Sequence, residues 1–265
     1  MSKNIRLGIV GFGNMGGALA KALRHNKTYK ICVYDFVAAK TSNRGFCVCP
    51  DSLALVANSD VVILAIKPQD IPHFVEAQKY SLAKKPLLLI SIAAGLPTGF
   101  YEKKLNKIKV VRVMPNLAAQ VGESVSFVCK GRFATTADLA VAKNIFSAVG
   151  SVFTAPESFF DKVTSICGSG PGYVFYIMDA VFAAALSQGF DRKTARRMVI
   201  DTFSGAVKLA KNSQKDFSDL TRSVTSKKGT TAAAIEVFDR NALAKIIKQG
   251  IEAARRRGEA IANSY

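Results

Sequence analysis

Two stretches of this chain carry residue types from which chemistry can be built. In the first, Gly11, Gly13 and Gly16 follow a short apolar run, with the spacing of a turn that holds the pyrophosphate of a dinucleotide. In that pattern the first glycine permits a tight turn, the second lets the backbone approach the pyrophosphate, and the third lets the next helix pack close to the sheet. Asp35 ends the following apolar strand, where an acidic side chain accepts hydrogen bonds from a ribose. This spacing predicts a dinucleotide site.

Asp35 leaves the identity of the dinucleotide open. A carboxylate that faces the ribose favours NAD(H), because it repels a 2′-phosphate. Lys40 and Arg44 follow shortly afterwards and could hold the 2′-phosphate of NADP(H) if the loop folds back. Asp35 could also be an ordinary turn residue at a strand end. The sequence therefore predicts NAD(H) or NADP(H) without choosing between them.

The second stretch, residues 224–234, reads Val-Thr-Ser-Lys-Lys-Gly-Thr-Thr-Ala-Ala-Ala. Gly229 gives the backbone freedom to turn, and Thr230 and Thr231 stand where a helix begins. Such a helix start offers free N–H groups, hydroxyls and the positive end of a dipole, which suit a small carboxylate. The alternative interpretation is an ordinary capped helix.

Further candidate residues follow buried strands, where ligands bind in parallel sheets. Residues 65–69, Ala-Ile-Lys-Pro-Gln, place Lys67 near the cofactor, and residues 91–95, Ser-Ile-Ala-Ala-Gly, are small enough for a ring to approach. Asn116 follows the next strand and offers both a donor and an acceptor, or it is a turn asparagine.

The elements that must position these residues alternate between strand and helix in the first part of the chain. This pattern predicts a doubly wound, mostly parallel sheet. The expected strands cover residues 6–11, 31–35, 61–66, 87–93, 110–114, 124–129 and 151–154, and the expected helices cover 17–23, 51–57, 72–83, 97–105 and 135–148. Two local signals support the helix starts, a possible cap at Asp51 and a capping box formed by Thr135 and Asp138.

From residue 156 onwards only helices are expected, over residues 158–164, 171–187, 191–212, 218–224, 230–238 and 241–263. We therefore predict a Rossmann domain over residues 1–155 and an all-helical domain over residues 156–265. The helix over 171–187 is apolar on nearly every face, so we expect it in a dimer core.

Composition narrows the class of protein. The chain has 265 residues, 49% of them hydrophobic, which is typical of a globular protein. No apolar run reaches the roughly 18 residues of a membrane span and no signal peptide is recognised, so a cytoplasmic protein without a membrane partner is expected. Five scattered cysteines and two histidines predict neither a metal site nor a histidine triad. The net charge of +18 is spread out, so a specific nucleic-acid partner is not expected.

Six motifs together resemble pyrroline-5-carboxylate reductases, in the family's order and over almost the whole chain. They are Gly-Phe-Gly-Asn-Met-Gly at 11–16, Ala-Ile-Lys-Pro at 65–68, Ser-Ile-Ala-Ala-Gly at 91–95, Val-Arg-Val-Met-Pro-Asn at 111–116, Gly-Ser-Gly-Pro at 168–171, and Val-Thr-Ser at 224–226 with Gly-Thr-Thr at 229–231. The resemblance implies NAD(P)H-dependent reduction of 1-pyrroline-5-carboxylate to L-proline, the last step of proline biosynthesis. It also implies a Rossmann domain, and a helical domain that interlocks with a second subunit in homodimers, which often assemble into decamers.

The resemblance also implies roles for single residues. Ser226, Gly229 and Thr230 would hold the substrate carboxylate and Thr231 would hydrogen-bond the ring nitrogen, so Ser226 and Thr231 are the predicted catalytic residues. Asn116 is a further predicted substrate contact. In a dimer, this loop would serve a cofactor bound mainly by one subunit. The implied cofactor contacts are Val10, Gly11, Phe12, Gly13, Asn14, Met15, Asp35, Asn58 on the adenosine side, Ala65, Ile66, Lys67, Pro68, Ile92, Ala93 and Ala94.

The chemistry fits these residue types. Hydride transfer to a C=N bond needs neither a nucleophile nor a metal, because the cofactor supplies the reactive group. The imine should react in its protonated form, so the Thr231 hydroxyl is expected to orient the nitrogen or relay a proton.

Two departures from the family pattern keep alternatives open. Lys228 stands where the family has glycine, so the loop either takes another backbone angle or stores strain, and the side chain could add a positive charge beside the carboxylate. Leu117 and Ala118 replace Thr-Pro and remove a hydroxyl near the nicotinamide. The alternatives are an imine or keto-acid reductase of altered specificity, and a nucleotide-binding regulatory protein without catalysis.

Overall fold

The computed structural model describes residues 4–41, 45–84 and 86–262. Contacts among Cα atoms group the chain into two compact units. Unit 1 comprises Met1–Pro171 together with Ala254–Tyr265, and unit 2 comprises Gly172–Ala253. The division of the sequence into domains at residue 155 stays a prediction.

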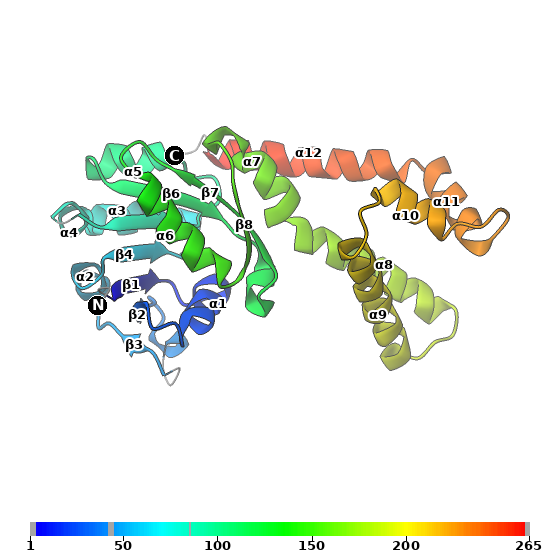
Figure 1. Ribbon diagram of the computed structural model, residues 1–265, viewed down its shortest axis with the longest axis horizontal. Coiled ribbons are helices and arrows are strands. Elements are labelled where there is room, and N and C mark those ends of the chain that lie inside the picture. Colours follow the sequence, from blue (N-terminus) through cyan, green and yellow to red (C-terminus); the bar gives the residue numbers. More distant parts are fainter. Residues whose placement is uncertain (1–3, 42–44, 85, 263–265) are drawn as a thin grey trace. The chain divides into compact units, whose positions relative to one another are not determined.

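Unit 1 is built on one eight-stranded sheet with the order β3-β2-β1-β4-β5-β6-β7-β8. Neighbouring strands run parallel except β6 and β7, so the expected doubly wound, mostly parallel sheet is confirmed (Figure 1). The strands are β1 (Ile5–Val10), β2 (Tyr29–Tyr34), β3 (Cys47–Val48), β4 (Val61–Leu64), β5 (Leu88–Ser91), β6 (Lys109–Met114), β7 (Ser124–Lys130) and β8 (Gly150–Thr154).

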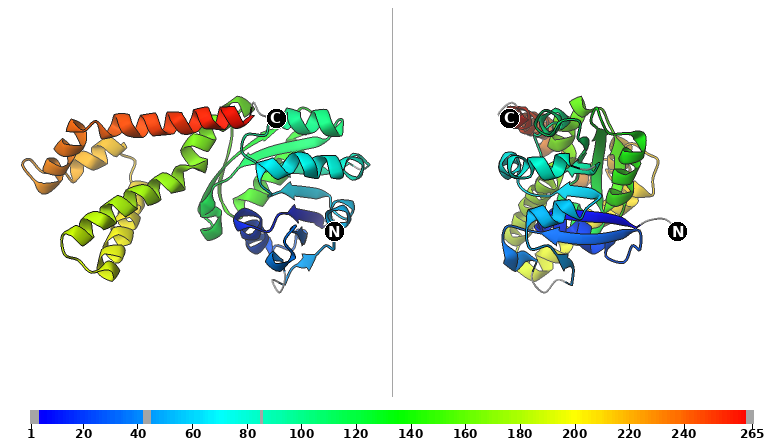
Figure 2. Two further views of the ribbon diagram at one scale, coloured as in Figure 1. Left: turned by 180° about the vertical axis from the view of Figure 1, so that it is seen from behind. Right: turned by 90° about the vertical axis from the view of Figure 1, so that its left-hand side faces the viewer.

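Helices cover both faces of this sheet because the central strands are apolar on both sides (Figure 2). One buried cluster joins β1, β4 and β5 to α1 (Asn14–Leu23) and α6 (Thr136–Ser147). A second cluster on the opposite face joins the same strands to α2 (Ser52–Ala57), α3 (Ile71–Ala77), α4 (Lys79–Ala83) and α5 (Thr98–Leu105). Successive strand residues alternate between the clusters, with Ile9 in the first and Val10 in the second.

The helix starts predicted from local signals are confirmed. The Asp51 carboxylate caps α2 by accepting from the Ala54 N–H at 2.7 Å. Thr135 and Asp138 form the predicted capping box of α6, in which each side chain accepts from the other residue's backbone N–H. Short-range capping chemistry is thus a dependable guide in this chain.

Other details differ from the sequence prediction. The two-residue strand β3 was not expected, because so short an edge strand has no readable pattern. The helix expected over residues 72–83 is interrupted at Gln78 and forms α3 and α4. β7 runs antiparallel to β6, since the connection over 115–123 contains only a 3₁₀ turn and is too short for a parallel crossover.

Unit 2 is helical. It contains most of α8 (Gly170–Ser187), then α9 (Arg192–Lys211), α10 (Phe217–Ser223) and α11 (Thr230–Arg240), and the first part of α12 (Leu243–Ala262). Short helical turns, including α7 (Phe160–Val163), precede α8 and belong to unit 1. The helical character expected after residue 156 is therefore confirmed.

Unit 2 exposes an unusual amount of apolar surface. Phe175 and Tyr176 of α8 are 59% and 79% exposed, and α8 contains no buried residue. α8, α11 and α12 also line an apolar groove of about 630 Å³. Among the described residues, one helical segment, Glu157–Ser187, has the length and mean hydropathy of a membrane span, a property that the core helix of a soluble protein can share. An apolar surface of this size needs a cover of some kind.

Candidate functional site

The glycine-rich turn after β1 has the geometry that its sequence predicts. Gly11 has a φ of +96°, and a Cβ atom there would lie 2.5 Å from the Ala65 carbonyl oxygen. Its N–H donates to the Tyr34 carbonyl oxygen at 2.7 Å. A Cβ atom on Gly16 would collide with the Gly11 carbonyl oxygen, which explains why the helix can pack so close to the turn. Both positions therefore need glycine.

Gly13 serves a different purpose from its two neighbours in the motif. Its φ of −79° is open to any residue, and a Cβ atom there would meet nothing within 4 Å. Gly13 is the N-cap of α1, whose first turn has neither a side-chain cap nor an acidic residue. Gly13 and Asn14 are exposed, so the free N–H groups of this helix start can receive an anion.

Asp35 is held by the protein itself. Its carboxylate accepts from the Phe12 N–H at 2.7 Å and from the Val37 N–H at 2.9 Å, and it pairs with the Lys40 ammonium at 3.3 Å. Only 6% of its side chain is exposed, against 49% for Lys40. Asp35 thus fixes the glycine-rich turn, and the exposed charge beside that turn is the positive one of Lys40.

The loop after β4 meets the glycine-rich turn. The Ala65 N–H donates to the Val10 carbonyl oxygen at 2.7 Å, and Ile66 lies within contact distance of a Cβ placed on Gly11. Lys67 is exposed and precedes the 3₁₀ turn that starts at Pro68. The structure therefore brings these predicted cofactor residues together at one edge of the sheet.

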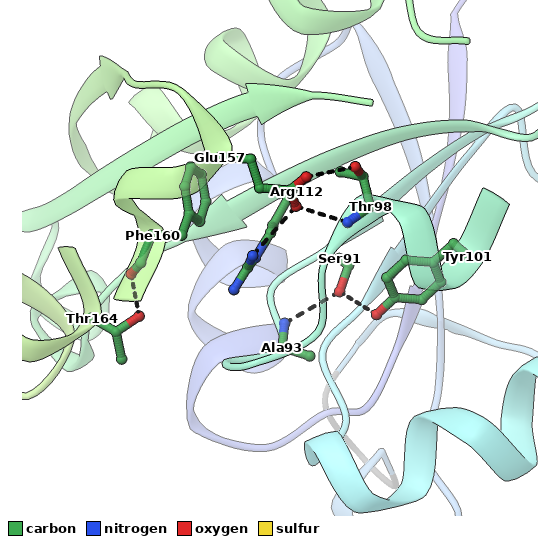
Figure 3. Close-up of polar contacts among 8 residues, drawn as sticks. All are labelled: Ser91, Ala93, Thr98, Tyr101, Arg112, Glu157, Phe160 and Thr164. Atoms are coloured by element: carbon green, nitrogen blue, oxygen red, sulfur yellow. Dashed lines mark hydrogen bonds and ion pairs between the residues drawn. The ribbon is translucent and has the colours of Figure 1, made fainter. Parts of the chain in front are cut away.

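The loop after β5 is braced by side chains that the sequence did not single out. The Ser91 hydroxyl lies 2.6 Å from the Tyr101 hydroxyl of α5, and it accepts from the Ala93 N–H at 3.3 Å (Figure 3). Ala93 is buried, whereas Ile92 and Ala94 are half-buried. The small residues of this loop are therefore held in a fixed conformation.

Glu157 fixes the other end of the same loop. Its carboxylate accepts from the Thr98 N–H at 2.7 Å and from the Thr98 hydroxyl at 2.8 Å, at the first residue of α5 (Figure 3). It also pairs with the buried Arg112 guanidinium at 3.3 Å, and that guanidinium lies over the Phe160 ring. Sequence reasoning missed this cluster because Glu157 and Thr98 are far apart in the chain and belong to no motif.

Asn116 is engaged at both ends of its amide. The side-chain oxygen accepts from the Ala118 N–H at 3.2 Å, and the side-chain nitrogen donates to the Cys167 carbonyl oxygen at 3.1 Å. This geometry is that of the turn asparagine, the alternative that the sequence left open. Its role as a substrate contact stays a prediction.

Asn58 lies apart from the other predicted cofactor residues. It follows α2 at the amino end of β4, where the Asp60 N–H donates to the Arg6 carbonyl oxygen. The glycine-rich turn is at the carboxyl end of the neighbouring strand β1, at the opposite edge of the sheet. The placement of Asn58 beside the adenosine is therefore corrected, since α2 carries this residue to the wrong edge.

The loop before α11 leaves its polar groups available. Gly229 is the N-cap of α11, which has no side-chain cap and no acidic residue in its first turn. Ser226 and Thr230 are exposed and Thr231 is half-buried. Within the described part of the chain, none of these three hydroxyls takes part in a hydrogen bond that caps the helix. The arrangement can bind a small anion through N–H and O–H donors.

The loop's unusual backbone angle lies at Lys228. Lys228 has a φ of +57°, in the left-handed region, whereas Gly229 has a φ of −79°. The turning residue is therefore Lys228, which corrects the expectation for Gly229, and of the two alternatives the loop takes the strained one. Gly229 is needed for space, because a Cβ atom there would collide with the Ser226 hydroxyl.

Two family profiles match the chain. One is described as pyrroline-5-carboxylate reductase dimerisation and matches residues 157–261. The other is described as NADP oxidoreductase, coenzyme F420-dependent, and matches residues 6–95. The two matches fall on the helical part of the chain and on the glycine-rich part of the sheet.

Relatives match over most of the chain. The pyrroline-5-carboxylate reductase of Methanosarcina acetivorans is 37% identical, over 89% of this chain and 90% of that protein. That of Arabidopsis thaliana is 30% identical, over 99% and 98%. Among solved structures, the Plasmodium falciparum pyrroline carboxylate reductase with NADP bound covers 98% of both chains with a TM-score of 0.89 and 28% identity.

Proposed function

Because the chain belongs to the pyrroline-5-carboxylate reductase family, we propose how its own residues carry out this reaction. The protein is an oxidoreductase that reduces the C=N bond of 1-pyrroline-5-carboxylate to L-proline with NAD(P)H, in proline biosynthesis. The observation that carries the assignment of roles is the uncapped start of α11 with its free hydroxyls.

The α1 helix start holds the cofactor pyrophosphate. Gly13 leaves an open approach, and the first N–H groups of α1 have no side-chain partner. Val10, Gly11 and Ala65 support this approach from the adjoining strand ends. The residues present therefore fit a dinucleotide.

The α11 helix start holds the substrate carboxylate. Ser226 and Thr230 supply hydroxyl donors and Thr230 also an N–H, and the helix dipole favours negative charge at that end. The Gly229 N–H donates to the Ser226 carbonyl oxygen at 2.9 Å, so Gly229 contributes the shape of the turn against which the carboxylate lies. Thr231 lies one residue into the helix, where its hydroxyl hydrogen-bonds the ring nitrogen and orients the protonated imine. When bound, the reduced nicotinamide supplies the hydride that the imine carbon receives.

We propose NADPH as the preferred hydride donor. The Asp35 carboxylate is occupied by two N–H groups and by Lys40, so it offers little repulsion to a 2′-phosphate. The Lys40 ammonium is half exposed and can pair with that phosphate. The relative from Plasmodium falciparum was solved with NADP bound, which agrees with this preference.

The protein self-associates through its helical part, which matches the family's dimerisation profile. We propose that the apolar surface of α8 is covered by a second subunit in a homodimer, and that dimers can assemble into a decamer. On this proposal the enzyme works in the cytoplasm, without a membrane or nucleic-acid partner. We also keep the proposed domain limits of 1–155 and 156–265.

The alternative of a regulatory protein without catalysis rests on Lys228 and Leu117. Lys228 stands where the family has glycine, and its left-handed backbone angle is one that glycine also adopts readily. The loop can therefore have the same backbone conformation with either residue. This geometry favours a working enzyme over the alternative.

The test is turnover of 1-pyrroline-5-carboxylate by purified protein with NADPH and with NADH, for the wild type and Lys40→Ala. We expect turnover with both cofactors and a preference for NADPH that falls about tenfold in Lys40→Ala, the loss of one charge-assisted contact. Lys103→Ala, a change in the last turn of α5, is the matched control. Nucleotide binding without turnover would support the regulatory alternative, and an unchanged cofactor ratio would refute the role of Lys40.

A further inference from the structure

Three cysteine thiols gather on one face of the β2–β3 pair. Cys32 of β2 is the register partner of Cys47 of β3, and their sulfur atoms lie 2.7 Å apart. Cys49 follows on the same side of the edge strand, and its thiol interacts with that of Cys32. None of the three belongs to the proposed site for hydride transfer.

The three thiols differ in their access to solvent. Cys47 is exposed on the edge strand, Cys32 is partly buried and Cys49 is buried. Burial, together with the neighbouring thiol of Cys47, raises the pKa of Cys32 to about 12, and burial also raises the pKa of Cys49. Among the described residues, no group of three or more His, Cys, Asp and Glu side chains could hold a metal ion.

We propose that Cys47 and Cys32 form an oxidisable dithiol whose substrate class is peroxides. The Cys47 sulfur attacks one peroxide oxygen, the O–O bond breaks, and Cys47 becomes a sulfenic acid while water or an alcohol leaves. The Cys32 sulfur then attacks the Cys47 sulfur, an S–S bond replaces the S–O bond, and water leaves with the Cys32 proton. In sum, two thiols are oxidised by two electrons and one peroxide is reduced.

The backbone already suits this bond. Paired residues on neighbouring strands lie about 4.8 Å apart, inside the range of Cα separations that disulfides span. Cys49 follows directly after β3, two residues from Cys47 and about 6.6 Å away along extended backbone, near the upper end of the disulfide range, so a bond between them would bend this segment. Cys32 is therefore the resolving partner of Cys47.

The bond would also close a functional segment. Residues 33–46 lie between the two cysteines and include Asp35 and Lys40, which hold the glycine-rich turn and the proposed phosphate contact. Closing a loop of this length restricts the unfolded chain. The oxidised protein should therefore unfold about 5 °C higher than the reduced protein.

The experiment treats the reduced full-length protein with one equivalent of hydrogen peroxide. Free thiols should fall from five to three per chain, five minus the two joined, and return to five with dithiothreitol. Trypsin cleaves at Lys40 and Arg44, so an unreduced digest should show the Cys32 peptide linked to the peptide that carries Cys47.

Single variants identify the partners. Cys49→Ser should keep the link, whereas Cys47→Ser should lose it. In Cys32→Ser the Cys47 sulfenic acid lacks its partner, so a second equivalent of hydrogen peroxide should oxidise it to sulfinic acid, which dithiothreitol does not reverse, with water as the other product. A link between separate chains only, or sulfinic acid on wild-type Cys47 beside a free Cys32, would overturn the proposal without the need for any variant to fold.

Discussion

The glycine-rich turn of unit 1 and the loop before α11 in unit 2 both present a helix start to an anion, yet they are held in opposite ways. In the turn, the N–H groups of Gly11 and Phe12 donate to Tyr34 and Asp35, and Gly11 is buried. In the loop, Ser226 and Thr230 are exposed, and α11 has no side-chain cap.

The hydrogen bonds that hold the turn come from the folded chain itself, whereas the exposed groups of the loop require a ligand as their partner. The turn is fixed by neighbouring strands, so its shape exists before any nucleotide binds. The hydroxyls of Ser226 and Thr230 in the loop are exposed, in a unit whose helix α8 contains no buried residue. Changes in the turn should therefore act on folding or nucleotide affinity, and changes in the loop should act on turnover.

The largest expected effect is in the turn, where Gly13→Val and Gly11→Ala should fail in different ways. Gly13→Val meets no protein atom within 4 Å, so we expect stability within about 1 kcal/mol of wild type but NADPH binding weaker by at least about 100-fold. Gly11→Ala, at a φ of +96° and against the Ala65 carbonyl, should instead unfold more readily. Titration calorimetry and urea unfolding separate the two. Tight nucleotide binding by Gly13→Val would contradict the assignment.

Glu157→Ala tests whether a buried ion pair in unit 1 stabilises the protein more than an exposed ion pair in unit 2. The change removes the carboxylate that accepts from the Thr98 N–H at the start of α5, and it leaves the Arg112 side chain, only 6% exposed, without its carboxylate partner. We expect the free energy of unfolding to fall by about 2 kcal/mol. Glu236→Ala breaks an exposed pair with Arg240 in α11 and should cost less than about 0.5 kcal/mol. If urea unfolding gives equal losses in the free energy of unfolding, the buried cluster stabilises the protein no more than the exposed pair does.

Thr231→Ala tests the loop's share of the chemistry. Loss of the hydroxyl that orients the imine should lower kcat about tenfold, with the Kd for NADPH unchanged. Thr225→Ser is the control, because its hydroxyl can still donate to the Thr221 carbonyl oxygen. A parallel loss of nucleotide affinity in Thr231→Ala would place this residue at the cofactor instead.

Local chemistry explains what the sequence predicts well. The glycine spacing at 11–16 and the Thr135–Asp138 box each need only a few consecutive residues, so their patterns are visible before folding. The same holds for the helical character after residue 156, which follows from periodicity.

Long-range geometry explains what the sequence does not predict. The Cys32–Cys47 pair depends on which strands become neighbours. The contact between Glu157 and Thr98 joins two segments that are far apart in the chain, and no local spacing reveals either contact. The family resemblance implies that Asn58 contacts the cofactor, but this residue follows α2 at the opposite edge of the sheet. Whether Lys228 changes its backbone angle or stores strain likewise depends on the folded loop.

Lys228→Gly has the smallest expected effect and compares the two regions directly. In the glycine-rich turn the residue with a positive φ is a glycine, Gly11, whereas in the loop it is Lys228. Lys228 has a φ of +57°, which costs a residue with a side chain about 1 kcal/mol, while glycine adopts it freely. Allowing for the greater freedom of glycine in the unfolded chain, we expect a net gain of about 0.5 kcal/mol. The same change at Lys227, where φ is not positive, should cost about 0.5 kcal/mol.

The two variants remove the same charge from the same loop, so the difference between them isolates the backbone strain. Urea unfolding gives the stability of each, and the KM for 1-pyrroline-5-carboxylate reports the charge. If Lys228 only stores strain, its variant gains stability and both variants show similar KM values. If its ammonium also attracts the substrate carboxylate, KM rises in Lys228→Gly alone, and the strain is then maintained in return for substrate affinity. A loss of stability at both positions would mean that the left-handed angle at Lys228 is relieved in solution.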